Sequence, residues 1–231
     1  MASWFGDAND NTIDWSSHGL AFNETGHSLS GLGGNDTIIG GNKGLIGGAY
    51  IGSTLDGGAG DDLLIAQAGD DALLGGTGDD VMFGGSGTDL LIGGAGNDQL
   101  AGDSGNNDRM AGGTGDDTYL VALVDDGRGD IINDDMSATW TPGSGGGAND
   151  FIDLVNTNLA SLAVARSGDD LLLSNVADFV NDNQFNSYVT VEDFFTQGQG
   201  FIEVIGVTDA LIAGTDLVAI VPNDGNFYLL V

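Results

Sequence analysis

The chain has 231 residues, a formal net charge of −31 and only four Lys or Arg residues. Such an acidic chain repels nucleic acid and anionic membranes, which are therefore excluded as partners. Disulfides are excluded because there is no cysteine, and no apolar run reaches the roughly 18 residues that a membrane helix requires. Hydrophobic residues make up 41% of the chain and the charge is patterned among them, so the composition does not indicate permanent disorder.

Residues 1–30 are predicted to cap or flank a repeat region that follows them. Within this segment, Gly6–Ile13 is a degenerate copy of the repeat, in which Asn11 occupies the aspartate position. The first residues, MASWFGDANDN, have neither the basic region nor the apolar segment of a Sec signal peptide. We therefore expect that they are not such a signal.

The repeat pattern itself begins at residue 31 as GLGGNDTII, with Asp36 at the predicted ligand position. The register is then lost up to residue 56. In this irregular part Leu55 keeps the character of a core residue, and Ser53 lies near the ligand position. We expect these coils to stack apolar side chains without filling a metal site.

From Gly57 to Leu120 a nine-residue phrase recurs in seven copies, one of which has an extra residue. The copies are GGAGDDLLI, AQAGDDALL, GGTGDDVMF, GGSGTDLLI, GGAGNDQLA, GDSGNNDRMA and GGTGDDTYL. Glycine at positions one, two and four favours tight turns, so positions one to six are predicted to form a loop and positions seven to nine a strand. Because side chains alternate along a strand, only the eighth residue should point inward. These residues are Leu64, Leu73, Met82, Leu91, Leu100, Met110 and Tyr119.

A single repeat cannot bury its apolar side chain alone, so successive repeats are predicted to stack, with two repeats in each turn of a flattened coil. Alternate loops then share an edge, and their sixth-position aspartates line up. One edge would carry Asp62, Asp80, Asp98 and Asp117, and the other Asp71, Asp89 and Asp108.

Two ladders of like charge repel themselves and need cations between the rungs. The chain offers only Lys43, Arg109, Arg128 and Arg166. A hard divalent cation bound by carboxylate and carbonyl oxygens is predicted instead, and calcium fits best because it tolerates irregular geometry. The predicted ligands come from positions one, three and six: Asp36, Gly57, Ala59, Asp62, Asp71, Gly75, Thr77, Asp80, Gly84, Ser86, Asp89, Gly93, Ala95, Asp98, Asp108, Gly112, Thr114 and Asp117.

Two repeats depart from the pattern. Ala66 and Gln67 replace two glycines in one of them, and Asp103 replaces the second glycine of the repeat that has the extra residue. We expect weaker or distorted calcium sites beside these two loops.

The nonapeptide period ends after Leu120, so the roll is assigned to residues 31–124 and a β-rich C-terminal cap to residues 125–231. Strands are expected at residues 151–155, 171–173, 188–191, 201–207 and 227–231, and a flexible linker at 141–147.

The nonapeptides resemble the RTX (repeats-in-toxin), or haemolysin-type, calcium-binding family. The segments NLASLAVARSGDDLLLS, SYVTVEDFF and FIEVIGV resemble the β-rich domain that often follows RTX rolls, and this resemblance implies that RSGDDL, from Arg166 to Leu171, forms a hairpin before a strand. The resemblance implies an all-β, right-handed parallel β-roll (a β-helix or solenoid) with Ca²⁺ in its turns. It also implies a bacterial protein secreted by a type I ABC exporter to the cell surface or beyond. The final GNFYLLV resembles the uncleaved C-terminal signal of that route, and it equally fits an ordinary terminal strand.

No catalytic constellation stands out, because His18 and His27 are the only imidazoles and neither lies in a nucleophile motif. The chain is therefore predicted to be a monomeric, non-enzymatic calcium-binding module. The resemblance to the RTX family implies that it is the C-terminal part of a larger secreted adhesin, surface-layer protein, toxin or hydrolase. Two alternatives are a stand-alone secreted calcium-binding protein and a module that binds carbohydrate or ice on the roll surface.

Overall fold

The computed structural model describes residues 2–15, 27–41, 52–103, 107–123, 129–134, 150–155, 157–175, 188–192, 194, 202–207, 210–213 and 228–229. The regular secondary structure of these residues consists of β-strands and a single 3₁₀ turn, η1 (Leu159–Ser161). In the described parts of the chain, none of the helical structure is long and apolar enough to span a membrane.

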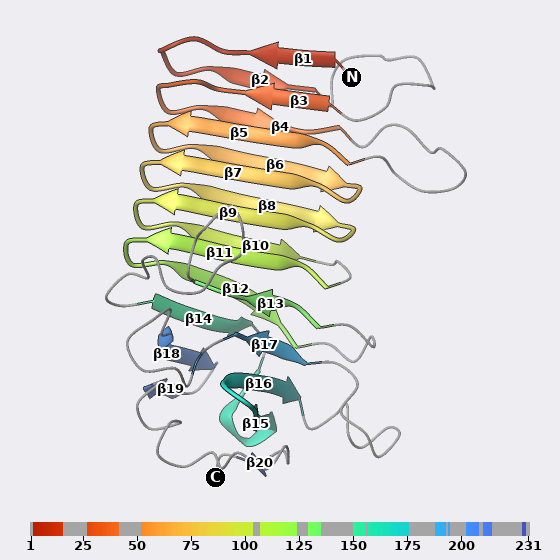
Figure 1. Ribbon diagram of the computed structural model, residues 1–231, viewed down its shortest axis with the longest axis vertical. Coiled ribbons are helices and arrows are strands. Elements are labelled where there is room, and N and C mark those ends of the chain that lie inside the picture. Colours follow the sequence, from red (N-terminus) through yellow and green to blue (C-terminus); the bar gives the residue numbers. More distant parts are fainter. Residues whose placement is uncertain are drawn as a thin grey trace, which may run out of the picture.

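The strands make two sheets (Figure 1). The first contains, in spatial order, β1 (Ala2–Phe5), β3 (His27–Ser30), β5 (Thr54–Ala59), β7 (Ala72–Thr77), β9 (Leu90–Ala95), β11 (Arg109–Thr114), β13 (Ile131–Ile132), β17 (Val189–Val191), β16 (Asp170–Asn175), β15 (Leu162–Ser167) and β20 (Tyr228–Leu229). The second contains β19 (Ala210–Ala213), β18 (Ile202–Val207), β14 (Asp150–Val155), β12 (Thr118–Ala122), β10 (Gln99–Asp103), β8 (Val81–Ser86), β6 (Leu63–Ala68), β4 (Thr37–Ile39) and β2 (Thr12–Asp14).

From β1 to β14, consecutive strands alternate between the two sheets, and neighbours within each sheet run parallel. In the regular part Leu55 pairs with Leu73, and Leu73 with Leu91, so each turn of the coil takes up two nonapeptides. The predicted parallel β-roll is thereby confirmed.

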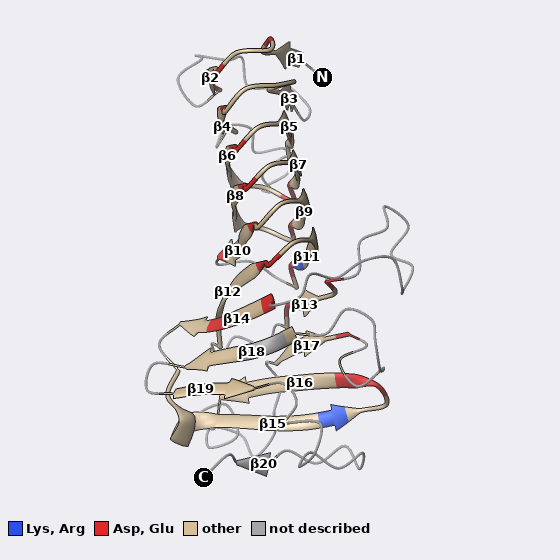
Figure 2. Ribbon diagram, turned by 90° about the vertical axis from the view of Figure 1, so that its left-hand side faces the viewer, with Lys and Arg blue, Asp and Glu red and all other residues tan. Residues whose placement is uncertain are grey.

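The two sheets face each other along the roll (Figure 2), and the eighth-position side chains fill the space between them. All seven of these side chains, from Leu64 to Tyr119, are fully buried, as predicted. The same column continues through the flanking coils, where Leu29, Ile38 and Ile132 are also fully buried. Burial of each such side chain contributes about 1.5–3 kcal/mol.

The strands are longer than predicted. β6 to β9 each have six residues, because positions one to three of a repeat continue the strand begun by positions seven to nine of the repeat before it. The second-position glycines pair in register across the coils, as Gly58 does with Gly76. The predicted division into a six-residue loop and a three-residue strand is therefore wrong, and the bend between strands is confined to positions four to six.

Three second positions that are not glycine nevertheless take the conformation of the glycines they replace. Leu32, Gln67 and Asp103 have φ angles of 75°, 83° and 68°. The left-handed region costs a non-glycine residue roughly 1–2 kcal/mol, and the side chain of Gln67 gains a hydrogen bond from its Nε2 to the carbonyl of Gly40, at 3.1 Å. The departures from the repeat thus strain the loops locally without interrupting the coil.

The roll continues beyond residues 31–124 in both directions. β1 and β2 pair in parallel with β3 and β4, although the first thirty residues were predicted to be a cap or flank. After the repeats, β13 and β14 pair in parallel with β11 and β12. The parallel pairing thus extends on both sides of the repeats, and the division of the chain into residues 1–30, 31–124 and 125–231 stays a prediction.

After the repeats, strands are present at each of the five segments predicted for the C-terminal region, as β14, β16, β17, β18 and β20. β15 and β16 form the predicted hairpin. Gly168 turns it with a φ of 67°, and Nε of Arg166 donates to the carbonyl of Gly168 at 2.7 Å. The predicted linker at residues 141–147 lies outside the described residues.

Candidate metal sites along the edges of the roll

The sixth-position aspartates form a continuous ladder along one edge of the roll. The backbone N–H of Asp62 donates to Oδ1 of Asp80, and the N–H of Asp80 donates to Oδ1 of Asp98, both at 2.8 Å. The same bond recurs in every coil of this edge, through Asn11, Asp36, Asp62, Asp80, Asp98, Asp117 and Asp150. Each aspartate is thus fixed by the coil that precedes it.

A second ladder runs along the opposite edge with the same polarity. Asp71 donates its N–H to Oδ1 of Asp89, and Asp89 donates to Oδ1 of Asp108, both at 2.8 Å. The ladder begins at Ser53, whose N–H donates to Asp71, and it ends at Asp130, which accepts from Asp108 at 3.1 Å. The predicted arrangement of the repeat aspartates on two edges is therefore the arrangement in the structure.

The other carboxylate oxygen, Oδ2, is buried and has no hydrogen-bond partner in each sixth-position aspartate of the repeats. This holds for Asp36, Asp62, Asp71, Asp80, Asp89, Asp98, Asp108 and Asp117. A buried carboxylate oxygen without a partner is strongly unfavourable unless a cation compensates it. A row of such oxygens fits a hard cation, which binds carboxylates directly.

The first-position glycines leave the space into which these oxygens point. A Cβ atom at Gly75 would lie 2.3 Å from Oδ2 of Asp80 and 2.6 Å from the carbonyl oxygen of Gly93. The same pair of contacts recurs at Gly57 and at Gly93. A carboxylate oxygen and the first-position carbonyl of the next coil therefore converge on one small volume. This arrangement supports position one as a source of carbonyl ligands, which remains a prediction.

The third-position carbonyls already have a role between coils. The carbonyl of Thr77 accepts from the N–H of Gly60 at 2.8 Å, and that of Ala95 accepts from Gly78 at 2.7 Å. A carbonyl oxygen has two lone pairs, so one remains for a metal ion. The predicted ligation by position three is thus compatible with the structure and stays a prediction.

Burial raises the pKa of the ladder aspartates above the ordinary value of 3.8. The pKa of Asp80 and of Asp98 rises to about 7 and that of Asp62 to about 6. Burial is the largest cause, the backbone N–H bond to Oδ1 opposes it, and the charges of neighbouring aspartates raise the pKa further. Without a cation these carboxylates are costly to ionise at neutral pH.

A further ladder, which sequence reasoning missed, is formed by the fifth positions. The N–H of Asp79 donates to Oδ1 of Asp61 at 2.9 Å, and the N–H of Asn97 donates to Oδ1 of Asp79 at 2.7 Å. In these bonds the later coil donates to the earlier one, whereas at the sixth positions the earlier coil donates to the later one. Adjacent loops are therefore joined by hydrogen bonds of both directions. The signal was present, since the fifth residue is Asp or Asn in six of the seven repeats.

The first-edge ladder is longer than predicted. Asp62 and Asp117 were expected to stand at its ends, but Asp36 precedes the first and Asp150 follows the second. Asp130 extends the other ladder in the same way. Asp130 and Asp150 were missed because they lie outside the nonapeptide period, yet each is followed two residues later by an inward isoleucine, Ile132 or Ile152, as in the repeats.

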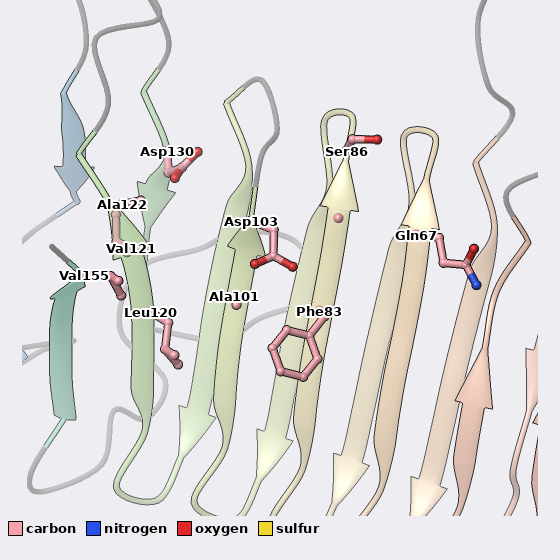
Figure 3. Close-up of a pocket in the computed structure, with 11 residues that line it drawn as sticks. Gln67, Phe83, Ser86, Ala101, Asp103, Leu120, Val121, Ala122, Asp130 and Val155 are labelled. Atoms are coloured by element: carbon pink, nitrogen blue, oxygen red, sulfur yellow. The ribbon is translucent and has the colours of Figure 1, made fainter.

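A groove on the outer face of the second sheet is a separate feature (Figure 3). Its volume is about 680 Å³. Phe83, Ala101 and Leu120 lie beside one another in adjacent strands, and the small side chain of Ala101 between two large ones creates the hollow. Gln67 and Asp103 add polar groups to its wall. The groove therefore offers an apolar surface with a polar rim, and it reaches the end of the second ladder at Asp130.

Comparison with protein families identifies the repeats between residues 28 and 118. The family model of the RTX calcium-binding nonapeptide repeat matches in four copies, at residues 28–42, 52–82, 74–107 and 107–118. These segments contain the repeat aspartates of both ladders, from Asp36 to Asp117. No curated protein matches the chain.

Proposed function

The repeat region, residues 28–42 and 52–118, belongs to the RTX calcium-binding repeat family, and from this premise we propose that the chain is a module that folds when it meets extracellular calcium and supports type I secretion. RTX repeats bind Ca²⁺ and are typical of secreted proteins. The repeat is a structural rather than a catalytic element. In this proposal the module is the C-terminal part of a larger secreted adhesin, surface-layer protein, toxin or hydrolase.

The observation that carries the proposal is the row of buried Oδ2 atoms without partners along each edge. In the calcium-free chain they oppose folding, because charges are moved out of water without compensation. When calcium binds at the same positions, the carboxylates favour folding instead of opposing it. Each ion that binds only the folded state adds RT ln(1 + [Ca]/Kd) to the stability of that state. Sites of this kind bind in the range of about micromolar to millimolar calcium, so they stay largely empty in the cytosol and fill outside.

Circular dichroism in calcium and in chelator tests the folding part of the proposal. We expect the β-signal to be lost on chelation and restored by Ca²⁺. The same concentration of Mg²⁺ is the control, because it screens charge equally but demands octahedral geometry. If the chelated protein kept the β content of the calcium-loaded form, calcium-dependent folding would be excluded.

Secretion from a bacterium that carries a type I exporter tests the second part. We propose that the export signal lies in the segment after β19, so deletion of residues 214–231 should abolish secretion. Asp98→Ala is the matched comparison, because it removes a ladder carboxylate and leaves that segment intact. It should slow export only modestly, through weaker folding outside. Undiminished secretion of the deletion variant would rule out a signal there.

A binding role on the roll surface is a second candidate, and the groove beside Phe83 favours it. The half-buried ring of Phe83 lines the groove together with polar groups, and such a surface is suited to a sugar ring. Phe83→Ala should then abolish binding to a carbohydrate array without changing the calcium-dependent β-signal. An array on which the wild type and the variant both bind nothing would remove this candidate.

A further inference from the structure

The C-terminal end of the first-edge ladder differs from its regular rungs. Asp117 belongs to the last nonapeptide, and Asp150 is the next rung, since the N–H of Asp117 donates to Oδ1 of Asp150 at 2.8 Å. Between them in sequence lies Asp134, two residues after Ile132, which pairs with Met110 in the adjacent coil. Asp134 therefore stands where the preceding coil has its first-position glycine.

That position matters because the first-position glycine normally leaves room for a carboxylate. A Cβ atom at Gly112 would lie 2.2 Å from Oδ2 of Asp117. In the following coil an aspartate side chain occupies the equivalent place. The end of the roll thus brings together three carboxylates, whereas each regular loop places two sixth-position aspartates beside each other.

The three carboxylates are close together and inaccessible to solvent. One carboxylate oxygen from each of Asp117, Asp134 and Asp150 lies within 4.8 Å of the others. The residues are 0%, 1% and 0% exposed. Oδ2 of Asp117 and Oδ2 of Asp134 have no hydrogen-bond partner. Oxygens bound to one calcium ion at roughly 2.3–2.6 Å lie up to about 5 Å apart, so three oxygens within 4.8 Å of one another can share a single ion.

Tyr119 fixes the orientation of Asp134. It occupies the core column, where the other six repeats have Leu or Met. Its hydroxyl accepts from the N–H of Gly112 at 2.7 Å and donates to Oδ1 of Asp134 at 2.5 Å. The donated bond occupies one oxygen of Asp134 and leaves Oδ2 for a ligand.

We propose that Asp117, Asp134 and Asp150 form a calcium site at the C-terminal end of the roll, with Tyr119 as its positioning residue. The site is separate from those between regular loops, because its third carboxylate comes from outside the repeats. Three carboxylates give it more negative charge than a regular loop site, and charge count raises affinity for calcium. It therefore fills first as calcium rises, and folding of the roll begins at this end.

Native mass spectrometry of the whole chain in calcium counts the ions and tests the proposal. Asp134→Asn keeps an oxygen that accepts from Tyr119 and removes one charge, so the variant should carry one ion fewer and lose the tightest step of a calcium titration. Asp98→Asn, in a regular rung, is the control and should retain that step. An Asp134→Asn variant with the wild-type ion count and first step would overturn the proposal and would indicate a carboxyl group that holds a proton instead.

Terbium luminescence gives a second readout that does not depend on the stability of an aspartate variant. Tyr119 lies beside the proposed ion, so excitation of tyrosine should sensitise terbium bound at low occupancy. Tyr119→Phe keeps the core filled and should lose this emission, whereas Tyr188→Phe should not. Equal emission from both variants would contradict a site next to Tyr119.

The test also distinguishes this site from the proposed repeat-loop sites. If the wild type bound one ion, removed by Asp134→Asn and unaffected by Asp98→Asn, the terminal site would stand and the repeat-loop proposal would fail. If calcium binding were instead weakened by Asp98→Asn and unaffected by Asp134→Asn, the repeat-loop sites would stand and the proposed terminal site would be excluded.

Discussion

Replacing Asp80 by asparagine should have opposite effects with and without calcium. Oδ1 of Asp80 accepts from the N–H of Asp62 at 2.8 Å, and Oδ2 is buried without a partner. Burial, and then the charges of Asp98 and Asp62, raise its pKa from 3.8 to about 7 against the effect of that hydrogen bond. Asparagine keeps the oxygen that accepts the hydrogen bond and removes the charge. The variant therefore separates the contribution of the hydrogen bond from that of the buried charge.

The magnitude follows from the pKa. At 1.36 kcal/mol for each pKa unit, ionised Asp80 destabilises the calcium-free roll by roughly 4 kcal/mol at neutral pH. Two or three such carboxylates equal the whole net stability of an ordinary domain, about 5–15 kcal/mol. Asp80→Asn should therefore stabilise the calcium-free roll at pH 7 by up to about 4 kcal/mol. In calcium it should lose part of the roughly 2.7 kcal/mol that an ion contributes at about 100 Kd.

The pH dependence has a definite sign. Because the folded state has the higher pKa, it binds the proton more tightly than the unfolded state does. The destabilisation by Asp80 is therefore absent below pH 3.8, grows as the pH rises, and is complete above about 7. Without calcium the wild-type roll should be more stable at pH 5 than at pH 7, and Asp80→Asn should reduce that difference.

Osmolyte-induced folding followed by circular dichroism measures both states, because an excluded osmolyte brings the calcium-free equilibrium into range. Asp79→Asn is the matched control, since Asp79 is the neighbouring residue and is exposed. It should change stability little in either state. Two results would refute the reasoning: a calcium-free Asp80→Asn roll less stable than the wild type, or equal effects of the two variants.

Two further predictions concern the ladder and the core. Asp98 lies between the carboxylates of Asp80 and Asp117, whereas Asp71 has Ser53 on one side, so Asp98→Ala should raise the midpoint of a calcium titration more than Asp71→Ala, and equal shifts would argue against shared ligation. Leu91 is fully buried, so Leu91→Ala should cost about 2–5 kcal/mol in urea unfolding with calcium present. Leu74→Ala, at an exposed ninth position, is the control, and a loss as large as that of Leu91→Ala would contradict the assigned core.

The repeat region was predictable because its period carries the register. Because each repeat has nine residues and each turn of the coil has two repeats, the position of a residue in the chain determines the edge on which it lies and the direction in which its side chain points. This is why the core residues from Leu64 to Tyr119 and the edges of the repeat aspartates follow from the sequence alone. The all-β parallel roll follows from the same period.

The ends of the ladders were not predictable in the same way. Asp130 follows Asp108 by 22 residues and Asp150 follows Asp117 by 33, so neither keeps the period. What places them is the pairing of β13 with β11 and of β14 with β12, which depends on contacts between distant segments. The strand length was mispredicted for a related reason, because Gly-Gly indicates a turn locally while the ladder of neighbouring coils holds it extended.

The fifth-position and sixth-position ladders run in opposite directions, and they have different roles: the first holds adjacent loops together, whereas the second makes the roll depend on metal. Bonds such as that from Asn97 N–H to Asp79 need no cation, and they lie on exposed side chains where a charge is not costly. The sixth-position bonds bury a carboxylate each time, as at Asp98. Because both ladders repeat with every coil, the stabilisation and the calcium requirement grow together with the number of coils. A roll lengthened by whole coils should therefore bind more calcium without becoming independent of it.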